Sequence, residues 1–321
     1  MTIDSATDTT IEDRLKQRLG PVHARQRLGI ENAHQQEVCS WSSMFFHREN
    51  WYSLHSLIRN SLRMVGLYRR GQRNATQIEL RHHHFQLPAL PSAFEGFRIL
   101  HLSDLHLDMY PEATHALIEK LRTVDYDLCV MTGDYRALTF GSIKSTMQYL
   151  AAVRTHLKNP VYAVLGNHDS IRMVPPMEDM GITLLLNESQ TIQRNGQSIV
   201  LAGIDDAHFF RVDNIEKTAS TTADNSVKIL LSHTPEVYRQ AAHAGFDVFL
   251  CGHTHGGQIC LPGGIPLTLD VNCPRYLGKG AWRYHHMQGY TSCGAGTSIV
   301  NVRFNCPPEI TLHTLHCGPH P

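Results

Sequence analysis

The sequence predicts an α/β protein with two β layers and helices on their outer sides, and three observations support this fold class. Between residues 97 and 169, apolar strand-like runs alternate with helical stretches, as in the β-α-β units of a largely parallel sheet. The second half of the chain is richer in strand-like runs, which two layers accommodate better than one open sheet. A hydrophobic content of 42% provides enough side chains for a sizeable core.

The first half of this region contains the clearer alternation. Its expected strands are 97–104, 126–134 and 161–169, and its expected helices are 111–124 and 142–157. Pro111 stands at the start of the first helix, where the absent N–H of proline costs no helical hydrogen bond.

The second half adds further strands and one clear turn. The expected strands are 182–189, 191–206, 227–235, 247–255 and 308–315. Within the second of these runs, Asn195–Gly196 is the dipeptide favoured in two-residue β-hairpin turns. Residues 235–245 are expected to form a helix, with Pro235 near its start and Gly245 after its end.

A change in character near residues 88–97 divides the chain. We expect residues 1–90 to form a partly helical N-terminal extension without strong strands, and residues 91–321 to form the main domain. The segment 81–84 (RHHH) lies in a strand-like run, where neighbouring side chains point to opposite faces, so its histidines cannot easily share one ion. An exposed edge strand is the favoured interpretation.

The segment 52–73 is basic and amphipathic. It carries five arginines and no acidic residue, and its apolar residues recur at roughly helical spacing. Such a helix either lies on an anionic lipid surface as a peripheral membrane contact or packs against the main domain, and the sequence leaves both interpretations open.

Bulk composition excludes several classes of protein. The formal net charge is zero, so no overall field indicates a nucleic-acid partner. The start of the chain lacks the apolar core of a secretory signal, and no apolar run approaches the roughly 18 residues that span a bilayer. The eight cysteines form no C-x-x-C pair, and Cys129 and Cys251 are expected in the core. We therefore expect a cytoplasmic protein, with peripheral attachment to the inner membrane face as the variant that residues 52–73 allow.

Polar residues typical of metal sites follow five of the expected strands. These residues are Asp104 and His106, then Asp134, then Asn167, His168 and Asp169, then His233, and finally His253 and His255. Ligands bind at the carboxyl ends of strands in open α/β sheets, so these segments are expected to meet at one edge. The sequence therefore predicts a metal centre there.

These motifs resemble the blocks of the calcineurin-like metallophosphoesterases. The blocks appear here as DLH, GD, GNHD, H and GHTH, and the resemblance covers residues 97–316. LSDLHL and GHTHGGQI are most similar to the bacterial phosphodiesterase branch, which includes membrane-associated members and relatives that hydrolyse the pyrophosphate of UDP-2,3-diacylglucosamine. The resemblance implies a four-layer α-β-β-α sandwich, which agrees with the strand pattern.

The resemblance also implies residue roles around two divalent metal ions, Mn, Fe or Zn. Asp104, His106 and His255 would hold the first ion, Asn167, His233 and His253 the second, and Asp134 both. His168 would stabilise the transition state or protonate the leaving group, and Asp169 would orient its imidazole.

The implied reaction is attack of a metal-bridged hydroxide on a phosphodiester or pyrophosphate bond, with a lipid-linked substrate if residues 52–73 bind lipid. The alternatives are a phosphomonoesterase or a cyclic-nucleotide phosphodiesterase acting on a soluble substrate, and a non-catalytic metal-binding module.

Departures from the family's protein phosphatases bear on the substrate. Leu165 stands where those enzymes carry an arginine before GNHE, which argues against a phosphoprotein substrate. Arg136 is a candidate replacement contact for phosphate, with a solvated loop charge as the alternative. Asp206, His208 and Arg211 could line the pocket, or they could belong to an ordinary loop.

Overall fold

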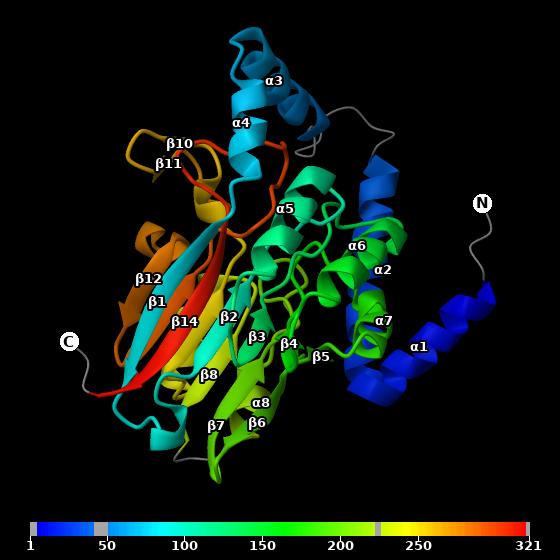
Figure 1. The fold of residues 1–321 in the computed structure, drawn as a ribbon. Coiled ribbons are helices and arrows are strands. Elements are labelled where there is room, and N and C mark those ends of the chain that lie inside the picture. The colour runs from blue at the N-terminus through cyan, green and yellow to red at the C-terminus, as the bar shows by residue number, and fades with distance from the viewer. Residues whose placement is uncertain (1–4, 42–50, 222–225, 319–321) are drawn as a thin grey trace.

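Two six-stranded sheets lie face to face, with helices covering their outer sides (Figure 1). This architecture comes from a computed structural model that describes residues 5–41, 51–221 and 226–318. The predicted α/β class and four-layer sandwich are confirmed.

The first sheet has the order β1-β14-β2-β3-β4-β5. Its strands are β1 (Glu79–Leu87), β2 (Arg98–Leu102), β3 (Leu128–Met131), β4 (Val161–Ala163), β5 (Thr183–Leu184) and β14 (Glu309–Cys317). Strands β2 to β5 run parallel, whereas β14 pairs antiparallel with β2 and parallel with β1. The carboxyl ends of β2, β3 and β4 therefore lie along one edge.

The second sheet has the order β12-β13-β9-β8-β7-β6. Its strands are β6 (Glu188–Arg194), β7 (Gln197–Gly203), β8 (Lys228–Leu231), β9 (Val248–Cys251), β12 (Gly280–Tyr284) and β13 (Met287–Thr291). The predicted Asn195–Gly196 turn joins β6 to β7, and both of its residues have positive φ, as this hairpin turn requires. A short hairpin, β10 (Cys260–Leu261) with β11 (Ile265–Pro266), stands outside both sheets.

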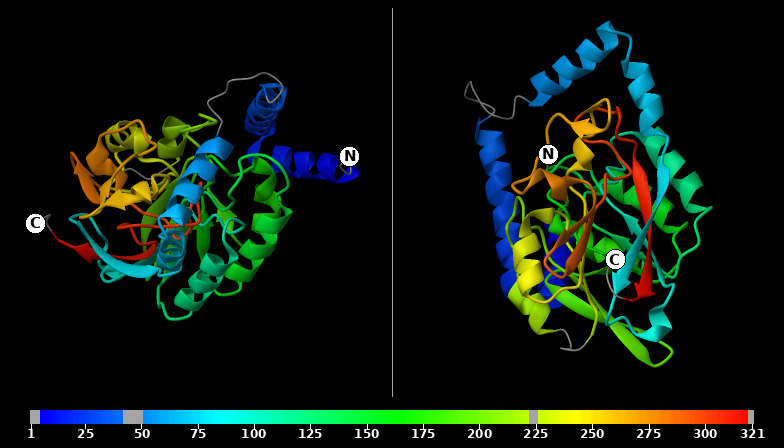
Figure 2. Two further views of the ribbon diagram at one scale, coloured as in Figure 1. Left: turned by 90° about the horizontal axis from the view of Figure 1, so that it is seen from above. Right: turned by 90° about the vertical axis from the view of Figure 1, so that its left-hand side faces the viewer.

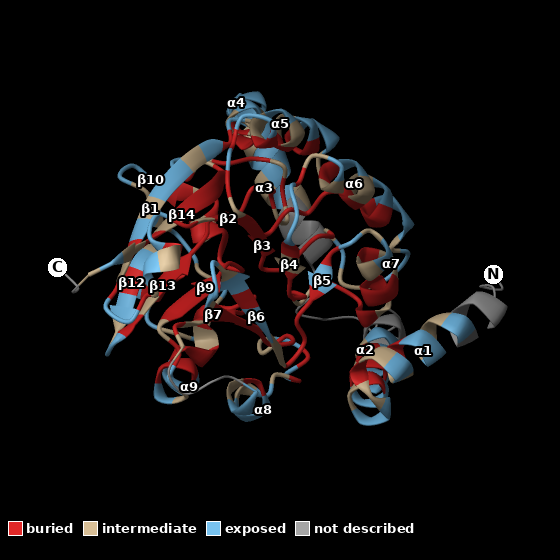
Figure 3. Cartoon of the chain, turned by 60° about the horizontal axis from the view of Figure 1, so that its bottom comes forward, coloured by how far each residue is buried: buried red, intermediate tan, exposed pale blue. Residues whose placement is uncertain are grey.

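Alternation along each strand builds the layers. In β2, Ile99 faces the second sheet, and Leu100 faces the helices of the first. The helices over the first sheet are α1 (Ser5–Leu19), α2 (Pro21–Trp41), α5 (Pro111–Leu121), α6 (Lys144–Arg154) and α7 (Val174–Asp179), and those over the second are α8 (Ile215–Ser220) and α9 (Tyr238–His243). Figure 3 shows that the strands are largely buried while the outer surfaces of the helices are exposed.

Helices α1 and α2 are bound firmly to the main domain. Arg18 forms ion pairs of 2.7 Å with both Glu178 and Glu188. Arg27 is fully buried, pairs with Glu31 at 2.6 Å and donates to the carbonyl of Asp169 at 2.9 Å. Part of the predicted extension is therefore an integral layer of the molecule.

Two further features differ from the expected extension. The amphipathic segment is not one helix but two, α3 (Trp51–Met64) and α4 (Tyr68–Ala75), because Gly66 adopts a φ of 71° between them. Strand β1 lies before the predicted boundary yet forms the edge of the first sheet, so the sheet begins at Glu79. The prediction of an edge strand around residues 81–84 is confirmed, and the statement that this region lacks strong strands is wrong.

The two short helices α3 and α4 stand at one end of the molecule, away from α1 (Figure 2). Within the described ranges, no helix is long and apolar enough to span a membrane.

Candidate metal centre

Loops that follow β2, β3, β4, β8 and β9 bring the predicted ligands together. Two groups of side chains result, each with ligand atoms within 4.8 Å of one another. The first group is Asp104, His106 and His255, and the second is Asp134, His233 and His253. All six side chains are buried, so the predicted convergence of strand ends places them in one interior site.

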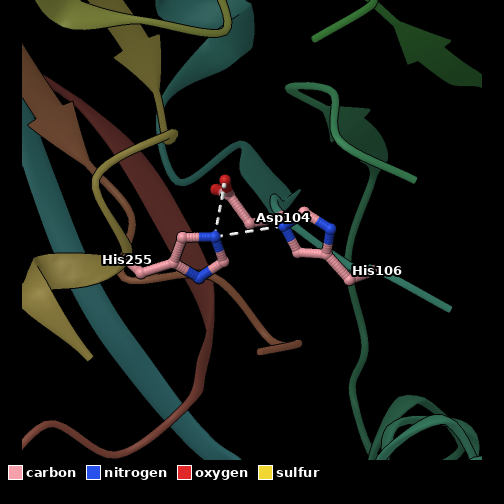
Figure 4. Close-up of side chains that lie close together, drawn as sticks. All are labelled: Asp104, His106 and His255. Carbon is pink, nitrogen blue, oxygen red and sulfur yellow. Dashed lines mark hydrogen bonds and ion pairs between the residues drawn. The ribbon is translucent and has the colours of Figure 1, made fainter. Parts of the chain in front are cut away.

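In the first group, His255 faces both the Asp104 carboxylate and the His106 imidazole (Figure 4). The Nε2 atoms of His106 and His255 are 3.1 Å apart, and His255 Nε2 lies 3.5 Å from Asp104 Oδ1. His106 donates its Nδ1 proton to the carbonyl of Arg136 at 2.8 Å. This bond leaves the Nε2 lone pair of neutral His106 free for a cation.

The second group is arranged in the same way. His233 donates from Nδ1 to the carbonyl of Thr132 at 2.8 Å, and its Nε2 faces His253 Nδ1 at 3.1 Å and Asn167 Oδ1 at 2.9 Å. The predicted fourth ligand, Asn167, is therefore at the site and presents its carbonyl oxygen.

Asp134 lies between the two groups. Its Oδ2 is 3.7 Å from His106 Nε2 and 3.4 Å from His233 Nε2. One carboxylate oxygen is thus within reach of both positions, as the predicted bridging role requires.

The backbone at the site is held in an uncommon conformation. Asp104, His106, Asp134, His253 and His255 all have positive φ, between 39° and 72°. Residues other than glycine rarely adopt this region, and strain of this kind concentrates at functional sites. The fold therefore holds these five side chains where local preference alone would not.

Two glycines allow the loops to approach closely. A Cβ at Gly252 would overlap the side chains of Ser103 and Asp104, and one at Gly166 would overlap the Asp134 carboxylate. Any side chain at either position would displace a ligand.

The ionisation of the site suits a cation. Burial lowers the pKa of His106 to about 4 and holds the pKa of His253 and His255 well below its usual range, so these rings are neutral and can act as ligands. Burial opposes charge on His233 as well, but the Asp134 carboxylate raises the pKa of His233 to about 10. A bound cation would displace that proton, because a ligating imidazole must be neutral.

The buried His253 Nε2 has no hydrogen-bond partner among the described residues. Carboxylate, imidazole and amide donors without thiolate fit Mn²⁺, Fe²⁺ or Zn²⁺.

His168 borders this centre without joining either group. Its Nε2 is 3.9 Å from Asp134 Oδ2, and its side chain is 24% exposed. Its Nδ1 is hydrogen-bonded to the hydroxyl of Thr139 at 3.1 Å. The imidazole is therefore fixed at the edge of the site, where it is accessible to a substrate.

The predicted role of Asp169 is wrong. Its carboxylate accepts backbone N–H groups of Asp134, Tyr135 and Gly166 at 2.7–2.9 Å instead of bonding to His168. It joins the loops after β3 and β4, and Thr139, which we did not predict, contacts the imidazole instead. Adjacency in sequence did not indicate which way the carboxylate points.

The four candidate substrate contacts lie in different settings. Arg136 is buried and donates to the carbonyls of Phe140 and Gly141, so its guanidinium serves the loop. Asp206 accepts backbone N–H groups of residues 208–210 and shapes a turn. Arg211 is exposed and bonds to the carbonyl of His208. These contacts favour the loop alternative for Asp206 and Arg211, whereas buried Arg136 is not the solvated loop charge that its alternative described.

His208 is the candidate that reaches the centre. Its ring lies 4.2 Å from that of His253, and its Nδ1 is 3.1 Å from Glu236. The Glu236 carboxylate raises the pKa of His208 against the opposing effect of burial. Glu236 thus favours the protonated form of an imidazole that lies beside the second group.

Arg303 is a further residue that the motifs did not reveal. Its guanidinium is fully buried and donates to the carbonyls of Cys293, Gly294 and Gly296, and its Nη1 lies 3.4 Å from the carbonyl of His255. It braces the loop that carries His255, and nothing in its local sequence marks it as part of the site.

Comparison with known proteins agrees with this geometry. A family model described as calcineurin-like phosphoesterase matches residues 97–257, half of the chain. Metallophosphoesterase YkoQ of Bacillus subtilis is 31% identical over 241 residues, which cover 72% of this chain and 87% of that protein. Phosphodiesterase YaeI of Escherichia coli is 30% identical over 238 residues, covering 68% of this chain and 82% of that protein. Metallophosphoesterase YkuE of Bacillus subtilis is 31% identical over 251 residues, covering 74% of this chain and 85% of that protein.

The fold, the ligand groups and these relatives define a metal-dependent phosphoester hydrolase. The chain belongs to the calcineurin-like phosphoesterase family.

Proposed function

We propose that the protein hydrolyses a phosphodiester or pyrophosphate bond at a centre of two divalent cations, and that its substrate is lipid-linked. The observation that supports the dinuclear centre best is the position of Asp134, one of whose oxygens lies within 3.7 Å of a ligand nitrogen from each group. When bound, two such cations supply Lewis acidity toward a phosphoryl oxygen and a hydroxide nucleophile near neutral pH.

Protein side chains would protonate the leaving group and bind the phosphate. Thr139 sets the rotation of the His168 ring, and Nε2 of that ring, which has no hydrogen bond to Thr139, can then give a proton to the departing oxygen. When protonated, His208, held by Glu236, would attract a phosphate anion on the side of His253. The preference for a diester draws support from the relative named as a phosphodiesterase.

The preference for a lipid-linked substrate depends on the exposed surface of α3 and α4. Leu57, Met64 and Val65 on and beside α3 are all more than 60% exposed, so α3 does not use this face to pack on the main domain. The exposed arginines at positions 69, 70 and 73 follow on α4. Apolar side chains next to basic ones are typical of a surface that binds anionic lipid.

The β10–β11 hairpin continues this surface next to the metal centre. Leu261 and Ile265 are exposed on it, and β10 begins five residues after His255. The carbonyl of Phe304 accepts from Cys260 at 2.9 Å, and Arg303 donates to the carbonyl of Gly71 on α4 at 3.0 Å. The hairpin and α4 are thus joined through residues 303–304 (Figure 1).

The reaction class can be tested with the metal-reconstituted full chain. We expect faster turnover of bis-p-nitrophenyl phosphate than of p-nitrophenyl phosphate, and hydrolysis of UDP-diacylglucosamine or a related lipid-linked pyrophosphate. A clear preference for the monoester would contradict the diester part of the proposal. Preference for a cyclic nucleotide, which is a soluble phosphodiester, would contradict the lipid-linked part.

The lipid part has a separate test by flotation with phosphatidylglycerol vesicles. The full chain should float at low salt, and a variant with Leu57→Ser and Val65→Ser should remain in the soluble fraction. Val22→Ser, at a 69% exposed position on α2, is the matched control. Recovery of wild type in the soluble fraction would remove the lipid part and leave the hydrolase part intact.

A further inference from the structure

A row of histidines, two of them fully buried, crosses the first sheet and ends at a proposed metal ligand. Its members are His83 on β1, His313 on β14 and His101 on β2, followed by the hydroxyls of Thr132 and Ser103 and finally the carboxylate of Asp104. We call the three histidines and two hydroxyl residues the histidine chain. His83 belongs to the RHHH segment. The three histidines lie on the neighbouring strands β1, β14 and β2 (Figure 1).

Each link of the histidine chain is a hydrogen bond. His83 Nδ1 lies 3.2 Å from His313 Nδ1, and His313 Nε2 lies 3.3 Å from His101 Nδ1. His101 Nε2 is 2.9 Å from the Thr132 hydroxyl. That hydroxyl donates to Ser103 at 2.7 Å, and Ser103 donates to Asp104 Oδ2 at 2.6 Å.

The carboxylate at the end determines where every proton lies. An ionised Asp104 only accepts, so the single proton of Ser103 points toward it and that of Thr132 points toward Ser103. His101 must then donate from Nε2 and accept at Nδ1. The same requirement passes outward, so that His313 donates from Nε2 and His83 donates from Nδ1.

The surroundings of the histidine chain keep the imidazoles neutral, as this arrangement requires. His101 and His313 are fully buried between the sheets, beside the Tyr290 ring. Burial lowers the pKa of His101 to about 3 and that of His83 to about 4. A neutral imidazole has one donor and one acceptor, which is what each internal link uses.

The two oxygens of Asp104 have different tasks. Both accept the backbone N–H of His253 at 3.0 Å, but only Oδ2 accepts from Ser103, whereas Oδ1 faces His255 Nε2 at 3.5 Å in the first ligand group. A rotation of the carboxylate would break the hydrogen bond to Ser103. The histidine chain therefore holds Oδ1 toward the position of the first cation.

Polar side chains are costly in such a core, since apolar residues could fill the same space without desolvation of ring nitrogens. Hydrogen bonds to ligating groups often orient them and tune their affinity for metal, and their loss typically costs about 10–100-fold in affinity.

We infer that the histidine chain is a positioning network for the first cation, in which His83, His313 and His101 act through Thr132 and Ser103 to orient Asp104. This inference rests on the proposed role of Asp104 as a metal ligand. Of the two hydroxyl residues, Thr132 offers the cleaner substitution, because its backbone carbonyl and not its side chain serves His233.

The affinity test compares Thr132→Val, which removes the hydroxyl but keeps the side-chain shape, with Thr132→Ser, which keeps the hydroxyl. Titration of the full chain with Mn²⁺ should show about tenfold weaker binding at one of two sites in Thr132→Val. Binding should be near wild type in Thr132→Ser and in His82→Phe, a variant of the exposed histidine that precedes His83 on β1. Equal affinities in Thr132→Val and wild type would overturn the inference.

A second readout is the tautomer of each histidine, measured by ¹⁵N–¹H correlation spectra of the Zn²⁺-loaded protein. His101 and His313 should carry their protons on Nε2, and His83 on Nδ1, with resonances assigned by His→Gln variants. A proton on Nδ1 of His101 would contradict the direction of the histidine chain.

Asp104→Asn separates the two levels of the proposal. If this variant binds Mn²⁺ as wild type does, the proposed centre itself fails. If it loses one ion while Thr132→Val does not lose affinity, only the positioning network fails.

Discussion

At the scale of single residues, His168 is distinguished from the ligands by its accessibility. It contacts Thr139 and stands 3.9 Å from Asp134, but it belongs to neither ligand group. Its contribution should therefore be to turnover and not to metal content.

We predict that His168→Ala reduces kcat for a chromogenic diester by about 10²–10⁴-fold, the usual contribution of general acid–base catalysis. Metal content and thermal stability should stay near wild type, and Thr139→Val should reduce kcat less, because the ring remains present. Loss of bound metal in His168→Ala would show that this residue is a ligand.

A second residue-scale prediction concerns the pH dependence of stability. Burial lowers the pKa of His101 from 6.5 to about 3 in the folded protein. Below about pH 6.5, His101 is protonated in the unfolded chain but stays neutral in the folded protein. This residue therefore reduces the free energy of unfolding as pH falls from 6.5 toward 3. The groups facing His101 are neutral His313, the Thr132 hydroxyl and, at 6.5 Å, the Tyr290 ring.

For metal-free protein, His101→Gln should remove this contribution. Between pH 7 and pH 5, the wild type should lose about 2 kcal/mol of unfolding free energy more than the variant does. Urea unfolding at both pH values measures the difference, and parallel losses in the two proteins would contradict the assignment.

At the scale of elements, the loop between β9 and β10 depends on Gly252. A Cβ there would overlap Ser103 and Asp104, the last two members of the row that ends at the first ligand group. The loop can carry His253 and His255 inward only while this position lacks a side chain.

Gly252→Ala should weaken binding of the first cation at least about tenfold, in line with the usual effect of disturbing hydrogen bonds to a ligand. Gly29→Ala is the matched control, since a Cβ at that position of α2 meets open space. It should leave metal binding unchanged and raise stability by about 0.5–1 kcal/mol. Undiminished metal affinity in Gly252→Ala would show that the loop tolerates the side chain.

Helix α2 is a second element with a defined attachment. Arg27 is buried between Glu31 and Asp205 and lies 3.3 Å from the centre of the Phe210 ring. Removing it leaves two buried carboxylates without their main counter-charge.

Arg27→Ala should therefore lower the free energy of unfolding by about 3–5 kcal/mol. Arg14→Ala, which breaks an exposed pair with Asp179, should cost less than about 1 kcal/mol. Chemical denaturation of the full chain compares them, and equal effects would mean that α2 is not anchored by its buried arginine.

The elements also show what the sequence could and could not predict. Strand alternation and the Asn195–Gly196 turn depend on local patterns, and both were predicted correctly. The pairing of β1 with β14 joins residues 79 and 309, and no local pattern carries such information. The break at Gly66 was missed because a single glycine is often tolerated inside a helix, at a modest cost.

At the scale of the whole molecule, the topology explains why the convergence of these side chains could be predicted. The carboxyl ends of parallel strands meet at one edge, so short motifs at those ends imply a common site. No comparable rule predicts from the sequence which way a side chain points inside a loop. The contacts of Asp169 with the loop after β3 and the histidine chain depended on contacts across the fold, and Arg136 turns to the carbonyls of its own loop.

The central claim is that Asp134 joins two adjacent cation positions. Anomalous diffraction from crystals grown with Mn²⁺ tests it most directly. We predict two peaks about 3.5–4 Å apart, one beside Asp104, His106 and His255 and the other beside Asn167, His233 and His253, with Asp134 touching both. A single peak, or peaks away from these side chains, would contradict the account.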